Sequence, residues 1–164
     1  MMTNAAYIDF HVLSEPWNTY RLADGTVLKL KFVLLKVNSS LFEEGKGQVG
    51  INQTTLIVTE APPSLRRSSG RDYSLDEITA AIVEPGMGIE PLRVEPSAYL
   101  MVDGKFVLAE TIVRRVGKSS LTGTDGDPKY RVDYESRISV LGPVFGPGTE
   151  PKGAPVSGED APQG

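Results

Sequence analysis

Apolar and polar residues alternate along several stretches of the chain, which is the pattern of β-strands with one buried and one exposed face. The first stretch places Ile8, Phe10 and Val12 on the face that we expect to be buried, and His11 on the other. In the last stretch, residues 130–140, apolar side chains alternate mainly with charged ones. These stretches predict a mainly β protein.

Two Asp-Gly pairs lie before long alternating stretches and predict β-hairpins, because a tight hairpin turn needs backbone angles that glycine adopts easily. The pairs are Asp24-Gly25 and Asp103-Gly104. We expect each of them to form a two-residue type I′ turn. Beyond Phe32 the apolar residues change parity, which predicts a β-bulge in that strand.

The two predicted hairpins belong to similar units of the chain. A shift of 79 positions places the first Asp-Gly pair on the second, and one further residue of offset places Glu15-Pro16 on Glu95-Pro96. We interpret the units, residues 15–58 and 95–140, as an internal repeat. The alternative is that turn chemistry alone makes any two hairpins look alike.

One segment between the units has the signals of an α-helix. Ser74 and Glu77 have the spacing of a capping box, and Pro85 stops the apolar periodicity. We therefore predict a helix over 74–84 that bridges the two units. Together these elements predict a single β-rich domain over 1–141, built from two related strand-turn-strand units as a small β-barrel or sandwich with one short helix.

Three polar segments are expected to lie outside the regular elements. We predict a mobile linker over residues 64–72, which are rich in Arg, Ser and Gly, and a long loop over residues 117–129. Nearly half of residues 142–164 are Gly or Pro, a composition that offers no apolar face for packing. We predict that they form a disordered C-terminal tail.

Composition narrows the possible chemistry. The chain of 164 residues has no Cys and one His, which excludes disulfides, cysteine nucleophiles and Cys-based zinc sites. Its net charge of −4 opposes a broad attraction to nucleic acid or anionic membranes. No apolar run reaches the roughly 18 residues of a membrane span, and no targeting segment is recognisable. We expect a cytoplasmic protein.

Few residues are candidates for catalysis. His11 shares a strand face with Asp9, which allows an acid–base pair, but no nucleophile motif lies near it, so we interpret it as a surface residue. Asp125 and Asp127 suggest a calcium loop only in part, since the terminal Glu of an EF-hand is missing. We therefore expect no enzyme, no catalytic residue, no metal site and no cofactor.

Four residues are candidates for binding. Trp17, the single tryptophan, marks a protein interface if it is exposed and plugs the core if it is buried. Arg66, Arg67 and Arg71 lie among serines and a glycine, a setting in which guanidinium groups bind phosphates.

Three functions are compatible with these features. The leading interpretation is a non-catalytic structural or protein-interaction module, a self-associating assembly subunit among the options, because small β proteins expose edge strands that pair with other chains. The alternative is a small β-barrel that binds nucleic acid through Arg66–Arg71 together with Lys29, Lys31 and Lys36. A carboxylate- or metal-dependent enzyme ranks last. We expect the partner to be a protein or a second copy, and no membrane.

Overall fold

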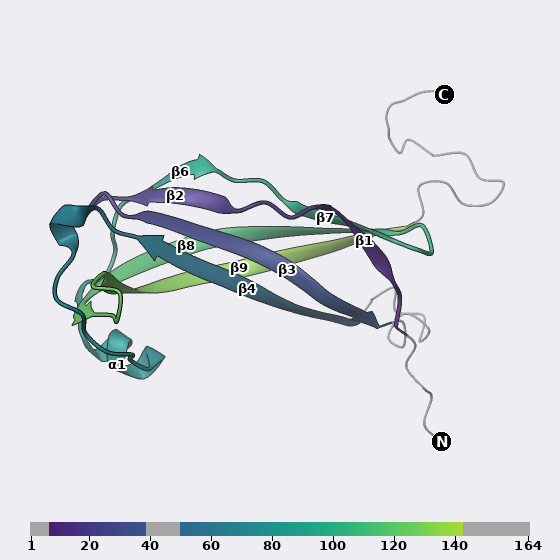
Figure 1. Ribbon diagram of the computed structural model, residues 1–164. Helices are drawn as coiled ribbons and strands as arrows, with labels where there is room; N and C mark the ends of the chain where they lie inside the picture. Colours follow the sequence, from purple (N-terminus) through teal and green to yellow (C-terminus); the bar gives the residue numbers. More distant parts are fainter. Residues whose placement is uncertain (1–6, 39–49, 143–164) are drawn as a thin grey trace, which may run out of the picture.

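The computed structural model describes residues 7–38 and 50–142 and shows two antiparallel β-sheets packed on each other, with a short α-helix at one end (Figure 1). The sheets do not close into a barrel, so the mainly β prediction is confirmed in its sandwich form. No helix among these residues is long and apolar enough to cross a membrane.

The first sheet has the strand order β4-β3-β2-β6. Its strands are β2 (Asn18–Leu22), β3 (Val27–Asn38), β4 (Gly50–Glu60) and β6 (Ile89–Arg93). The second sheet contains β1 (Phe10–Ser14), β5 (Ile82–Glu84), β7 (Ser97–Met101), β8 (Phe106–Thr122) and β9 (Pro128–Leu141). In it β9 follows the whole of β8, β7 and β5 pair with opposite ends of β8, and β1 pairs with β7.

Each sheet takes one of its outer strands from the other half of the chain. Strand β1 pairs with β7 in the second sheet, and β6 pairs with β2 in the first. The chain crosses between the sheets after β1 and again after β6, at the two Glu-Pro pairs. Because proline has no N–H to donate to a ladder, Pro16 and Pro96 end one strand before the next begins.

With an offset of 79, the pairing of β1 with β7 corresponds to that of β6 with β2, and the pairing of β2 with β3 corresponds to that of β7 with β8. Phe10 faces Met101 in the second sheet, and the corresponding residues, Ile89 and Leu22, face each other in the first. The predicted bulge interrupts β3 after Leu34, and β8 has an irregularity at the corresponding place. A common ancestor of the two units stays a prediction, and these registers support it.

Both Asp-Gly pairs form hairpin turns, but with three loop residues. The Gly25 N–H donates to the Leu22 carbonyl at 2.9 Å, and the Leu22 N–H donates to the Thr26 carbonyl at 2.8 Å. This is the pattern of a type I turn followed by a glycine bulge. Gly25 has φ +91° and Gly104 has φ +94°. The prediction of a two-residue type I′ turn is therefore wrong. Each loop has three residues, because the glycine bulge adds one residue to the turn.

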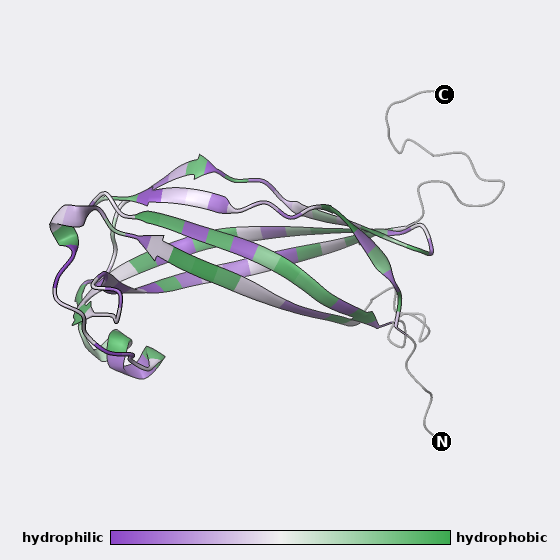
Figure 2. Cartoon of the chain, viewed as in Figure 1, coloured by the Kyte–Doolittle hydropathy of each residue, from purple (hydrophilic) through white to green (hydrophobic). Residues whose placement is uncertain are grey.

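The core lies between the sheets and draws on both of them. One cluster of buried side chains combines Leu28 and Leu30 of β3 with Val116 of β8, and a second combines Phe32 of β3 with Tyr99 of β7 and other residues of the second sheet. The alternation of polar and apolar colour along β3 follows this burial (Figure 2). Each fully buried aliphatic or aromatic side chain contributes about 1.5–3 kcal/mol.

The helix is shorter than predicted. Helix α1 spans Leu75–Ala80 and has the expected capping box, in which the N–H of Glu77 donates to Ser74 Oγ and the Glu77 carboxylate accepts from the N–H of Ser74. Residues 82–84, predicted as its last turn, instead form β5 on the edge of β8. The β-branched Ile82 and Val83 favour that extended pairing.

Two further predictions concern loops. The loop predicted over 117–129 is wrong in extent, because β8 continues through Thr122 and only a short turn precedes β9. The polar residues of this segment suggested a loop, but a strand at the surface also has polar residues at every second position. The tail predicted over 142–164 lies, beyond Gly142, outside the described residues.

Candidate functional site

The arginine-rich segment is packed against the turn between β8 and β9. The Arg67 N–H donates to the Gly126 carbonyl, and the Gly70 N–H donates to the Gly123 carbonyl, both at 2.9 Å. A side chain on Gly70 would collide with the backbone of Thr122. The mobile linker predicted over 64–72 is therefore wrong, because the turn supplies acceptors for its backbone N–H groups.

Two of the three candidate phosphate-binding arginines already have partners within the chain. Arg66 Nε lies 3.0 Å from the carboxylate of Asp127, whose side chain is only 5% exposed. Arg71 stacks on the ring of Tyr73 at 4.1 Å and pairs with Glu77 at 3.0 Å. A phosphate would compete with these partners for the charge of the two guanidinium groups.

The two aspartates of the calcium-like loop bind the protein itself. Asp125 accepts a hydrogen bond from the N–H of Asp127 at 3.0 Å, and Asp127 accepts one from the N–H of Ala61 at 3.2 Å. Over residues 7–38 and 50–142, no group of three or more His, Asp or Glu side chains is placed to hold a metal ion. The contact with Ala61 joins the end of β4 to the start of β9.

Trp17 and His11 lie in different settings. Trp17 is half-buried, and the Lys31 ammonium lies 5.5 Å from the centre of its ring, so it is neither a core plug nor a free aromatic surface. His11 is exposed on β1. Val12 is also 53% exposed, contrary to the predicted buried face, because β1 is an outer strand that pairs only with β7 in its sheet.

A polar cluster joins the first hairpin turn to the second sheet. The Tyr130 hydroxyl donates to Asp24 at 2.6 Å and shares a hydrogen bond with Thr26 Oγ1 at 2.8 Å, while Lys118 Nζ lies 3.0 Å from Asp24. Burial opposes ionisation of Asp24, but these hydrogen bonds outweigh it and hold its pKa below the usual value.

The same cluster fixes the protonation of its tyrosine. Burial, assisted by the Asp24 carboxylate, raises the pKa of Tyr130 well above its usual value, so the hydroxyl is a neutral donor. The turn explains only part of the role of Asp24, and no sequence signal joins residues that lie about a hundred positions apart. The geometry supports a structural ion pair.

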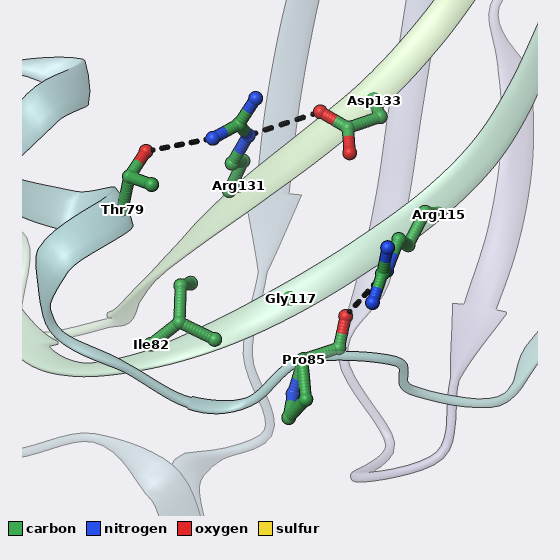
Figure 3. A pocket seen from close by; sticks show the side chains of 7 residues that line it. All are labelled: Thr79, Ile82, Pro85, Arg115, Gly117, Arg131 and Asp133. Carbon is green, nitrogen blue, oxygen red and sulfur yellow. Dashed lines mark hydrogen bonds and ion pairs between the residues drawn. The ribbon is translucent and has the colours of Figure 1, made fainter.

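A depression of about 320 Å³ lies where α1 and the segment after it cover β8 and β9 (Figure 3). Arg131 crosses from the sheet to the helix, and it donates to Asp133 and to Thr79 Oγ1, each at 3.0 Å. Arg115 Nε donates to the Pro85 carbonyl at 3.0 Å. Both guanidinium groups therefore fasten the connection between the units to the second sheet.

The two long outer strands, β4 and β9, occupy corresponding places in the two sheets. Each is paired on one side only within the described residues, β4 with β3 and β9 with β8. Adding 81 to a β4 residue number gives its β9 counterpart, since Ile51 faces Val37 and Val132 faces Val116. The chain thus presents two long strand edges that can be compared position by position.

These two edges differ in charge. On the face of β9 that points away from the core, successive side chains are Arg131, Asp133, Glu135 and Arg137. The corresponding residues of β4 are Gly50, Asn52, Thr54 and Leu56. Charged side chains along an edge oppose pairing with another strand, because pairing would bury them. Strand β9 is protected in this way and β4 is not.

An apolar run lies on the unprotected strand. Leu56, Ile57 and Val58 are 45%, 41% and 39% exposed, and Figure 2 shows a continuous hydrophobic stretch in this half of β4. Ile57 faces Leu30, on the core side of the sheet, and stays exposed because β4 is the outermost strand. The uncharged, partly β-branched run was a signal that the sequence offered and that we did not single out.

No family model, curated protein or solved structure matches the chain. Its surfaces are therefore the basis for inferring what it does, and the β4 edge, defined as the unpaired side of residues 50–60 with its exposed Leu56, Ile57 and Val58, is the candidate functional site.

Proposed function

We propose that this protein is a non-catalytic interaction module that binds a partner chain by strand addition at the β4 edge. The observation that carries the proposal is the difference between the two edges on the face away from the core, where β9 has a row of charged side chains and β4 has none. An open strand offers a row of N–H and C=O groups, and an added strand satisfies them while its side chains cover the apolar run.

The expected gain in free energy is moderate. If a partner covered Leu56, Ile57 and Val58 completely, burial would contribute on the order of 3–5 kcal/mol at about 25 cal/mol per Å². Backbone hydrogen bonds add to this, and the loss of translational and rotational freedom opposes it. A binding free energy of this size is compatible with a contact between chains in an assembly, rather than with permanent burial in a core. The arginine segment is a weaker candidate, since Arg66 and Arg71 are engaged.

Hydrogen exchange tests this proposal at the strand itself. Amides of β4 that point away from β3 should exchange fast in dilute purified protein, and should become protected at high concentration or in an extract of the cells that produce the protein. Val58→Lys should abolish the protection. Ser139→Lys, at the corresponding place on β9, is the matched control and should leave the protection of β4 unchanged. If β4 stays unprotected under every condition, the proposal is wrong.

A further inference from the structure

We infer that the partner at the β4 edge is a second copy of this chain, paired β4 to β4 in antiparallel orientation about a twofold axis. This inference rests on the proposed function and adds the identity of the partner. In such an interface both copies contribute the same patch, so β4 must be compatible with itself.

The composition of β4 satisfies that requirement. From Gly50 to Thr59 the strand carries no charge, so no like charges meet in an antiparallel register that pairs these ten residues with those of its own copy. Its one carboxylate, Glu60, is held by Lys29 of the neighbouring strand at 3.1 Å. The side chains directly opposite each other are therefore uncharged over ten consecutive positions.

The apolar run selects a register. When Leu56 faces its own copy, Ile57 lies opposite Thr55 and Val58 lies opposite Thr54, so methyl groups cover the run on both faces of the sheet. Glu60 then lies opposite Asn52, a polar and uncharged neighbour. The two four-stranded sheets join into one continuous sheet of eight strands, with the apolar runs at its centre.

The protected edge explains why this association stops at two copies. A β4 to β9 contact would be head to tail, would leave a free β4 and would continue to grow. It would also cover the charged row on β9, at a cost in desolvation. The other outer strands of the described residues are shorter: β1 and β6 have five residues each and β5 has three, and short edges are poor templates for pairing. Pairing through β4 consumes both apolar edges.

Light scattering or sedimentation of the full chain over a range of concentrations measures the dimer. The wild type should change from monomer to dimer as concentration rises, and Ser139→Lys should do the same. Val58→Lys should remain a monomer at concentrations where the wild type is dimeric. Circular dichroism melting checks that the variant folds, and Thr54→Lys, at a second exposed position of β4, repeats the test.

Disulfide formation tests the register, because the chain has no cysteine of its own. Leu56→Cys should oxidise to a covalent dimer, since facing positions in antiparallel strands bring the two Cα atoms within about 4.5–5.5 Å, inside the range that a disulfide spans. Arg137→Cys, the corresponding β9 residue, should not link. Linking of Arg137→Cys in place of Leu56→Cys would overturn the inference.

The outcomes separate the two proposals. A wild type that is monomeric at every concentration, but whose β4 amides are protected in cell extract, overturns the dimer and keeps strand addition to a different protein. A dimer that Val58→Lys and Thr54→Lys both leave intact overturns the β4 dimer and leaves strand addition to its own exchange test. A dimer lost in both variants and retained in Ser139→Lys supports both proposals.

Discussion

At the residue scale, a few positions have backbone conformations that most residue types rarely adopt. Gly25 has φ +91° in the first hairpin turn, a region that side chains with a Cβ rarely adopt. We expect Gly25→Val to lower the free energy of unfolding by about 1–3 kcal/mol, measured by denaturant titration. Gly86→Val is the control, because its surroundings are open and its φ is ordinary. Equal stability of the two variants would refute the assignment of the turn.

The carboxylate of Asp24 makes stability depend on pH. Because its pKa in the folded protein is lowered, it stabilises the fold above its unfolded value of about 3.9, and this contribution is lost as the pH falls through the lower folded value. Asp24→Asn should destabilise the protein near neutral pH by about 2 kcal/mol, through weaker hydrogen bonds to Tyr130 and Lys118. It should also flatten the loss of stability on acidification, measured by thermal melting across pH. A variant with the same acid profile as the wild type would contradict this role.

At the scale of elements, side-chain contacts hold the connection between the two units in place, because its helix is too short to be stable by itself. Helix α1 has only six residues, too few for stability in isolation, and Arg131 holds it to β9 through Thr79. Arg131→Ala should therefore raise hydrogen exchange over residues 75–80, with a cost of about 1 kcal/mol. Arg137→Ala, which removes an exposed pair with Glu135, should leave exchange in α1 unchanged.

At the scale of the whole molecule, the exchange of outer strands makes the halves depend on each other. The first half lacks β6 and the second lacks β1, so each half alone leaves β2 or β7 without one neighbour and exposes a face of the core. Fragments 1–72 and 73–164 should each fail to fold as a monomer, and mixing them should restore a cooperative transition in circular dichroism. A half that unfolds cooperatively as a monomer would contradict this dependence.

The sequence determined the local features of the protein. The capping box at Ser74, the hairpins at the Asp-Gly pairs and the alternation of residues 130–140 are encoded in a few neighbouring residues, so pattern and turn chemistry predicted them. The bulge after Leu34 was also visible as a change of parity. The end of the helix was not, since residues 82–84 gain their partners from β8, far along the chain.

Only the tertiary structure decided how these elements combine. Which sheet each strand joins depends on contacts between the halves, such as Phe10 with Met101, and no local pattern encodes a partner about ninety positions away. The cluster around Asp24 and the packing of the arginine segment on Gly126 have the same origin. The difference in charge between β4 and β9 is already present in the sequence of the two strands. It became an inference about function only when the fold placed both strands on outer edges, where an unpaired backbone and missing charges have a physical consequence.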